Sequence, residues 1–179
     1  MELEKTEANF LTGDSLDPRE GIISVEETIK AIPGAYIGDS DRCPLKHSFS
    51  DGIYVREIFI PAGDILVGKI HKHEHPNFLM SGEVEVFTEN DGLQTIKAPC
   101  SMISSAGTKR TLRAKTDLVW ITVHSNPTNT TDLDELEEEV IANSFLEYDE
   151  FRKKEDKKLD YIKKNNLYCR FKNYLLKIL

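Results

Sequence analysis

Cysteine is scarce in this chain and follows no recognisable spacing. Only three of its 179 residues are cysteines, Cys43, Cys100 and Cys169, and none forms a CxxC pair. An odd number of widely spaced cysteines argues against a disulfide framework and against a four-cysteine zinc site. The sequence therefore predicts a protein of a reducing compartment, and we expect a cytoplasmic location.

The chain also lacks the apolar stretches that membranes and secretion require. No segment approaches the roughly 20 consecutive apolar residues of a membrane-spanning helix. The first ten residues, MELEKTEANF, are polar and acidic. We therefore expect no membrane partner and no signal peptide. The sequence also has no phosphate-binding loop, no glycine-rich dinucleotide motif and no recognisable Ser-His-Asp pattern.

Positive charge is in deficit overall but is concentrated at one end. With 23 Lys and Arg against 31 Asp and Glu, the net charge is −8, which argues against nucleic acid as a partner. Residues 152–179 carry ten bases and three acids, directly after residues 132–151 with nine acids and no base. Nucleic-acid contact by the basic segment is one interpretation. We prefer packing between these segments, within or between chains, because their charges are opposite.

Residues 1–52 are predicted to form an N-terminal arm with one short helix. Turn formers such as Gly13 and Pro18 indicate that residues 1–20 drape over the surface. Ser24 followed by Glu27 is typical of a capping box, and the following Pro-Gly pair ends the helical pattern. These signals predict a helix near residues 25–32.

Residues 53–125 have the pattern of a β-barrel. Runs such as IYVREIFI, ILVGKI, GEVEVFT, QTIKA and LVWITVH alternate with turn signals, among them an Asn-Asp-Gly hairpin signal. Short strands at regular spacing, without helices between them, are typical of a sandwich or barrel. We therefore expect a mostly β, jelly-roll-like fold with helical N- and C-terminal extensions and no helix within residues 53–124.

Residues 126–179 are predicted to be a linker followed by helices. The polar run SNPTNTT precedes TDLDELEEEVIA, whose acidic first turn suits a helix N-terminus. From residue 145 onward the pattern is that of an amphipathic helix, continuous or broken at Asn165-Asn166. Its apolar stripe needs a partner surface, so we expect a homodimer or larger oligomer. The stripe consists of Leu167, Phe171, Tyr174, Leu175 and Ile178.

The segment KIHKHEHPNFLMSGEVEV carries the densest chemical pattern. Lys69, His71, His73 and His75 fall at alternate positions, and alternate side chains of a strand share one face. Imidazoles on one face can converge on a divalent transition metal, while the neighbouring lysine favours an anion. The alternative is a solvent-exposed, histidine-rich hairpin. Because residues 72–76 are expected to form the turn, His73 is the weaker metal candidate.

The same region resembles the first motif of the cupins. In PAGDILVGKIHKHEHPNFLMSGEVEVF, Gly63 and Gly82 match the two glycines of that motif. The resemblance extends over roughly residues 50–125 and implies a cupin-type jelly-roll barrel. Aligned on the glycines, the glutamate of the family falls at His75. The two histidines of the family fall near Lys69 and His71, or, with a slip in the turn, on the first two histidines of this segment.

A second segment, APCSMISSAGTKRTLRA, resembles the second cupin motif. Arg110 stands where the family has its last histidine. The usual metal site of the family, three histidines and one glutamate, is therefore altered at two positions. His124 ends the strand run LVWITVH, in phase with Trp120 and Thr122. Together with His71 and His75, it would complete a three-imidazole site for a divalent transition metal such as Zn, Fe, Ni or Mn.

Further residues are expected around the same pocket. The motif resemblance places Lys69 and Arg110 near the barrel mouth, where a guanidinium can bind carboxylate or phosphate in a bidentate manner. Arg113 has the opposite strand parity and is expected to point away. Tyr54 and Arg56 share a face of an early strand, so they either line the cavity or cover the outside.

Two functions remain open at this point. One is a non-enzymatic pocket that binds, and in one version sequesters, a small anionic ligand bearing phosphate or carboxylate. The other is a metal-dependent enzyme of the isomerase or oxygenase kind that cupins host. The run from CPLKHSFSDGIYVREI through TDLVWITVH and the acidic helix also resembles small cupin-like proteins of tailed bacteriophages. That resemblance implies a viral origin, and hence the host cytoplasm.

Overall fold

The computed structural model describes residues 10–13, 17–36 and 39–175, with the side chains of residues 168–169 and 171–175 left out. The chain divides into two compact units, residues 1–142 and residues 143–179. The elements of the first unit are α2 (Pro18–Lys30), β1 (Leu45–Ser50), β2 (Ile53–Ile60), β3 (Ile65–Val67), β4 (Ile70–His71), β5 (His75–Ser81), β6 (Glu83–Thr88), β7 (Gly92–Lys97), β8 (Cys100–Ser104), β9 (Arg110–Ala114), β10 (Leu118–Ser125), α3 (Leu133–Val140) and β11 (Ile141–Ala142). The second unit is the helix α4 (Phe145–Leu175).

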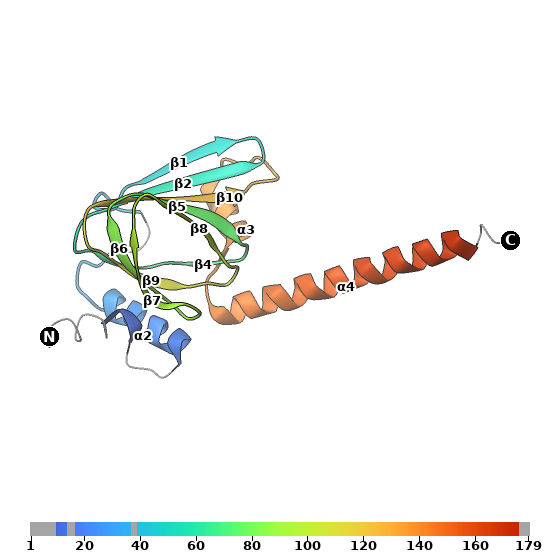
Figure 1. Cartoon of the computed structure of the whole chain (residues 1–179), viewed down its shortest axis with the longest axis horizontal. Coiled ribbons are helices and arrows are strands. Elements are labelled where there is room, and N and C mark those ends of the chain that lie inside the picture. The colour runs from blue at the N-terminus through green and yellow to red at the C-terminus, as the bar shows by residue number, and fades with distance from the viewer. Residues whose placement is uncertain (1–9, 14–16, 37–38, 176–179) are drawn as a thin grey trace. The chain divides into compact units, whose positions relative to one another are not determined.

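Two antiparallel sheets face each other and enclose the interior of the first unit (Figure 1). One has the order β1-β2-β10-β5-β8, and the other has the order β3-β9-β6-β7. A jelly roll has eight strands, in two facing sheets of order 1-8-3-6 and 2-7-4-5. The two sheets here have this order when β2 is numbered 1 and the short strands β4 and β11 are left out of the numbering. The cupin-type fold class predicted from sequence, with helical extensions at both ends, is therefore confirmed. The sheet begins at Leu45, earlier than the expected boundary at residue 53.

The inward side chains change from apolar to polar along β10. Leu118 and Trp120 are followed on the inner face by Thr122 and then by His124, and all four are buried. The residues that pair with β10 follow the same change. Ile58 and Leu79 lie opposite Trp120, Arg56 and Asn77 lie opposite Thr122, and Tyr54 lies opposite His124. The barrel thus has an apolar end and a polar end.

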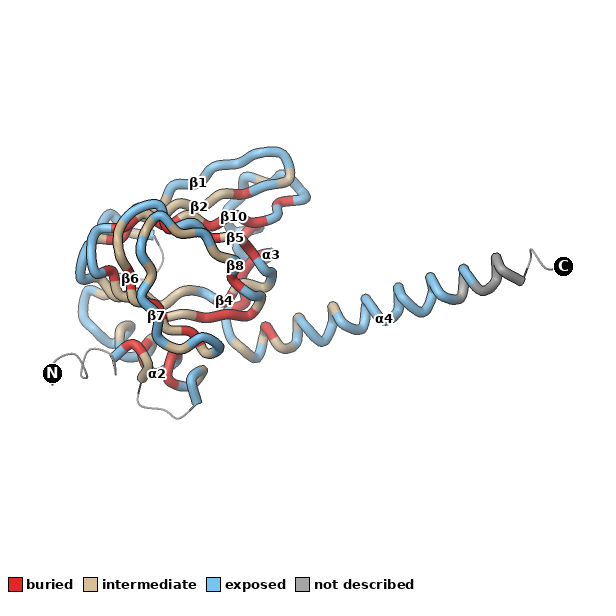
Figure 2. The backbone as a smooth tube through the Cα atoms, in the orientation of Figure 1, coloured by how far each residue is buried: buried red, intermediate tan, exposed pale blue. Residues whose placement is uncertain are grey.

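The hydrophobic core occupies the apolar end. Buried aliphatic side chains from both sheets pack around Trp120, which is 4% exposed. Figure 2 shows the corresponding alternation of buried and less buried positions in the strands, and exposed positions along most of α4. The core cluster consists of Ile60, Leu79, Val84, Val86, Leu112, Ala114, Leu118 and Trp120.

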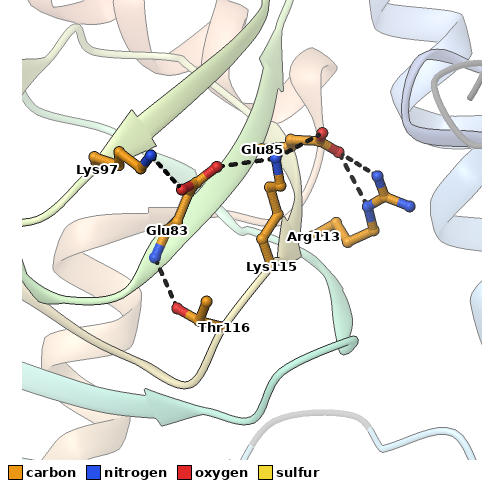
Figure 3. Close-up of polar contacts among 6 residues, drawn as sticks. All are labelled: Glu83, Glu85, Lys97, Arg113, Lys115 and Thr116. Atoms are coloured by element: carbon orange, nitrogen blue, oxygen red, sulfur yellow. Dashed lines mark hydrogen bonds and ion pairs between the residues drawn. The ribbon is translucent and has the colours of Figure 1, made fainter.

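The outer face of the four-stranded sheet carries a row of ion pairs (Figure 3). Glu83 lies 2.9 Å from both Lys97 and Lys115, and Glu85 lies 2.7 Å from Arg113. Glu85 and Arg113 are direct cross-strand partners, so Arg113 points away from the cavity, as its strand parity predicts. Exposed pairs of this kind contribute only about 0.2–1 kcal/mol each.

The N-terminal helix α2 is longer than predicted. It begins at Pro18 because Asp17 caps it, accepting a hydrogen bond from the Arg19 amide at 2.9 Å, while proline fits the first helical position. The expected start near residue 25 and the expected surface arm through residue 20 are therefore wrong in part. Ser24, interpreted as a cap, lies inside the helix, where its carbonyl accepts from the Thr28 hydroxyl.

A close backbone contact joins the start of the described chain to α2. Leu11 is fully buried, and its carbonyl accepts a 2.6 Å hydrogen bond from the Thr111 hydroxyl in β9. A Cβ at Gly21 would lie 2.2 Å from the carbonyl oxygen of Thr12. Glycine at position 21 is therefore required by this approach and not by its backbone angles.

We expect Gly21→Ala to lower the free energy of unfolding by roughly 1–3 kcal/mol, because the methyl group must displace backbone. Alanine normally stabilises a helix interior by about 1 kcal/mol relative to glycine, so the expected sign is opposite to helix propensity. Urea denaturation measures the effect, and Ser24→Ala at an exposed position of the same helix is the control. A Gly21→Ala protein as stable as the wild type would contradict the contact.

The C-terminal elements also start at recognisable caps. Asp132 caps α3 by accepting hydrogen bonds from the amides of Asp134 and Glu135 at 2.9 and 3.3 Å. In the second unit α4 continues through Asn165 and Asn166, so the alternative with a break there is not observed. Among the described residues, no helix combines the length and apolar character needed to cross a membrane.

The predicted apolar stripe of α4 is largely outside the described side chains. Leu167 is 68% exposed, whereas the side chains of Phe171, Tyr174 and Leu175, and residue 178 altogether, lie outside the described set. Assembly into a homo-oligomer therefore stays a prediction, which sedimentation at micromolar concentration can test.

Candidate functional site

Three histidines from three strands meet at the polar end of the barrel. His71 ends β4, His75 begins β5, and His124 lies near the end of β10. Their ring centroids are 4.2 Å (His71–His75), 4.7 Å (His75–His124) and 5.0 Å (His71–His124) apart. The backbone of His71 is held from two sides, because Gly107 donates to its carbonyl at 2.8 Å and β11 pairs with β4. Because β4 and β5 do not pair with each other, the bend at residues 72–74, and not one continuous strand face, brings the first two rings together.

The cluster offers one nitrogen from each ring within a small volume. A ligand atom can be chosen on each histidine such that all three lie within 4.8 Å of one another. Two buried nitrogens, His71 Nδ1 and His75 Nε2, have no hydrogen-bond partner among the described residues. Buried polar atoms without partners are uncommon and point to an ion, water or ligand. The donor set therefore fits a divalent transition metal.

Neighbouring groups fix which nitrogen His75 presents. Its Nδ1 lies 3.2 Å from the carbonyl oxygen of His73. A carbonyl oxygen only accepts, so Nδ1 must carry the proton and donate it. In the neutral ring, Nε2 then carries the free electron pair, and this same atom lacks a hydrogen-bond partner among the described residues. A backbone carbonyl that orients a histidine in this way is a common second contact of metal-binding imidazoles.

The three imidazoles are neutral near pH 7. Burial holds the pKa of His71 well below its usual value, and the neighbouring His75 and His124 lower it further. Burial also lowers the pKa of His75 to about 4, despite the opposing effect of the His73 carbonyl. The pKa of His124 falls to about 3, again mainly through burial. Neutral imidazole is the form that binds metals.

Two of the three clustered histidines border a cavity of about 450 Å³ inside the barrel. His71 and His124 line it together with Tyr54, Arg56 and Arg110, which share the inward face of their strands. This volume is within the range of pockets for small molecules. Arg56 and Tyr54, for which the sequence left open an outward orientation, thus line the cavity.

Arg110 is held by residues of the opposite sheet. Its guanidinium donates a short hydrogen bond to the Ser104 hydroxyl, and its Cζ lies 5.7 Å from the centroid of the Trp120 ring. Burial lowers its pKa to about 10, so it remains charged at neutral pH. A Cβ at Gly68 would lie 3.2 Å from the Cγ of Arg110, so glycine makes room for this side chain.

Sequence reasoning missed Asn77, whose side chain forms hydrogen bonds with three residues around the site. Asn77 is fully buried, and its amide donates to the Ser104 hydroxyl at 2.8 Å and to the His75 carbonyl at 3.1 Å. Its own carbonyl accepts from the Trp120 indole at 2.9 Å. The available signal was parity, because Asn77 lies two residues after His75 and therefore shares its face.

Tyr54 joins the site to an edge strand. Its ring stacks on His124 at 5.9 Å, and its hydroxyl lies 2.7 Å from Nδ1 of His47 in β1. Burial raises the pKa of this phenol. Tyr54 thus presents an ordered aromatic wall to the cavity, with its hydroxyl already engaged.

Two of the predicted site residues lie apart from the cluster. His73 is exposed in the turn, outside the group of three, in agreement with its weaker position in the sequence argument. Lys69 borders the cavity but is half exposed and forms an ion pair with Glu137 of α3. Its charge is therefore compensated by the protein itself.

Comparison with solved structures gives cupin-type barrels. A double-stranded β-helix protein of Klebsiella pneumoniae has a TM-score of 0.43 and 16% identity, over 53% of this chain and 87% of the other. The cupin domain of Schizosaccharomyces pombe Cnp3 has a TM-score of 0.42 and 14% identity, over 51% and 71%. A cupin 2 conserved barrel domain protein of Salinispora arenicola has a TM-score of 0.42 and 11% identity, over 54% and 87%. No family model matches the chain, and no curated protein matches it in sequence.

Proposed function

We propose that the barrel cavity binds a divalent transition metal through His71, His75 and His124, and receives a small anionic ligand beside it. The observation that carries the proposal is the meeting of three neutral imidazoles, two of which have a buried nitrogen without a partner. Zinc, iron, nickel and manganese are all compatible with imidazole ligands. A metal on three protein ligands keeps an open position and acts as a Lewis acid on a bound oxygen.

The residues of the chain divide the remaining tasks. The carbonyl of His73 orients the ring of His75, and Tyr54 packs against the ring of His124. Arg110 and Arg56 provide positive charge for an anionic group of the ligand, since a guanidinium matches carboxylate and phosphate geometry. The apolar core below the cavity excludes water from that side. An isomerase or oxygenase activity, which the cupin resemblance implies, would depend on the metal.

Metal analysis of protein purified without a histidine tag tests the proposal. We expect close to one equivalent of zinc, iron, nickel or manganese per chain after reconstitution of chelator-treated protein. His124→Ala and His71→Ala are each expected to weaken metal binding by at least about 100-fold, because each removes a direct ligand. His73→Ala is the matched control, since this histidine lies in the bend between β4 and β5 but outside the cluster. Wild-type protein that takes up none of these metals would refute the proposal.

A metal-free anion pocket is the second candidate function. It is favoured by the charged Arg110 beside the imidazoles, where it contributes to the lowered pKa values of His71 and His75. In that case the histidines would donate and accept hydrogen bonds to the ligand as neutral rings. The two functions differ in one measurable respect, because only the second predicts unchanged ligand affinity after complete chelation.

A further inference from the structure

Two arginines of the cavity belong to facing sheets. Arg56 is in β2 of the five-stranded sheet, whereas Arg110 is in β9 of the four-stranded sheet. Both line the cavity and both are mostly buried. His71 and His124 line the same cavity as these two arginines. A molecule bound beside the cluster is therefore within the field of both guanidiniums.

Neither guanidinium has an acidic partner in the part of the chain that the structure describes. Among the described residues, the Arg110 guanidinium donates its one hydrogen bond to the neutral Ser104 hydroxyl. No hydrogen bond or ion pair of the Arg56 side chain is found among the described residues, and burial lowers the pKa of this group. Buried charges are normally paired, because an unpaired charge in a low-dielectric interior is costly.

The acidic residues that line the cavity are engaged elsewhere. Glu26 binds Lys109 at 3.2 Å, and Glu137 binds Lys69. Asp39 accepts a hydrogen bond from the amide of Leu45 at 3.3 Å. Asp39 keeps its negative charge, and Asp39 and Glu137 raise the pKa of Arg56 against the effect of burial, without a hydrogen bond or ion pair to it. The two guanidiniums are the cationic groups of the cavity wall that have no ion pair among the described residues, since Lys30 and Lys69 each have one.

We infer that the natural ligand of this cavity is a small molecule with two negative charges, a dicarboxylate or a phosphorylated compound, bound by Arg56 and Arg110 together. The inference deepens the proposed function, on which it rests for the location of the ligand beside the histidines. Its own basis is that two guanidiniums without an ion pair line one cavity from facing sheets. A planar guanidinium binds each acidic oxygen pair through two parallel hydrogen bonds, so both charge and geometry select such a ligand.

Paired ligands of equal length test the charge requirement. We would titrate succinate, butyrate and inorganic phosphate into the full-length protein by calorimetry, once metal-loaded and once chelator-treated. Succinate is expected to bind at least tenfold more tightly than butyrate. Tighter binding of phosphate than of succinate would assign the site to phosphorylated compounds, and the reverse would assign it to dicarboxylates. Butyrate binding as tightly as succinate and phosphate, or binding of none of the three to folded protein, would overturn the inference.

Three variants, each of which replaces one arginine with uncharged glutamine, locate the groups that bind the ligand. Arg56→Gln and Arg110→Gln are each expected to weaken binding of the preferred dianion at least tenfold. Arg113→Gln is the matched control, because Arg113 is on the same strand as Arg110 but pairs with Glu85 on the outer face. Arg56→Lys and Arg110→Lys keep the charge and lose the planar fork, so an intermediate loss is expected. Unchanged affinity in both glutamine variants would overturn the inference.

Stability and metal measurements on the same variants keep the outcomes separate. Each glutamine variant removes a buried charge that has no ion pair, so the ligand-free protein should be at least as stable as the wild type in thermal denaturation. The dianion should raise the melting temperature of the wild type and of Arg113→Gln, but not of Arg56→Gln or Arg110→Gln. Metal-free protein that still binds the dianion, together with no uptake of any metal, would refute the metal centre and leave this inference intact. Metal uptake without dianion binding would support the metal centre and overturn this inference.

Discussion

Lowering the pH from 7 to 5 is expected to destabilise the metal-free protein by at least about 4 kcal/mol. In the unfolded chain the clustered histidines titrate near 6.5, whereas in the folded protein burial holds the pKa of His75 at about 4 and of His124 at about 3. The unfolded state therefore binds more protons below pH 6.5, so stability falls as the pH falls. His75 and His124 each contribute roughly 2 kcal/mol over this range, and the lowered pKa of His71 acts in the same direction.

The loss is expected to begin near pH 6.5 and to continue to about pH 4, where His75 starts to protonate in the folded state. Arg56 and Arg110, which face the cluster from the two sheets, add to the effect because they oppose imidazolium formation. Urea denaturation at half-unit pH intervals measures the slope. His75→Gln should reduce the slope by about one proton, whereas His73→Ala should leave it nearly unchanged. Equal unfolding free energies at pH 7 and pH 5 would show that the imidazoles are not buried as neutral groups.

Glu26→Gln is expected to lower the free energy of unfolding by roughly 3 kcal/mol, because it leaves a buried ammonium without its partner. Lys109 is only 5% exposed, and its Nζ lies 3.2 Å from the Glu26 carboxylate. This ion pair connects α2 to the segment that precedes β9. The same helix contributes Glu26, Ile29 and Lys30 to the cavity wall, so its detachment should also weaken ligand binding.

A matched pair of variants separates this effect from general loss of charge. Glu27→Gln, one residue further along α2, removes a carboxylate whose side chain is 66% exposed and which pairs with Lys30. Its expected effect is below about 1 kcal/mol. Replacing both buried partners, in Glu26→Leu with Lys109→Met, should recover most of the stability lost in Glu26→Gln. Equal effects of the two glutamine variants in thermal or urea denaturation would contradict a buried pair.

Strand parity and the cupin resemblance together predicted that the histidines meet. His71 and His75 are separated by an even step, His124 is in phase with Trp120, and alignment on the motif glycines places position 75 at a ligand position of the family. The outward orientation of Arg113 needed only local alternation, which strands keep whatever sheet they join.

Properties that depend on distant partners were not accessible in this way. The start of α2 at Pro18 was missed because Ser24 and Glu27 formed an equally good local signal. The charge state of the histidines depends on burial, which no local pattern reports. The role of Asn77 depends on Ser104 and Trp120, which are distant in sequence and adjacent only in the folded sheet. Lys69 looked like a free cation until Glu137 was placed beside it.

The change from apolar to polar side chains along β10 has a consequence for how this barrel can evolve. The residues of the hydrophobic core lie around Trp120, whereas the residues of the proposed ligand site lie two and four positions further along the same strand. Substitutions at the levels of Thr122 and His124 can therefore alter which molecules enter without removing core contacts. Because the buried arginines cost stability in the absence of a ligand, many such changes would even be tolerated as gains in stability. Specificity in this barrel is thus free to diverge while the fold is retained.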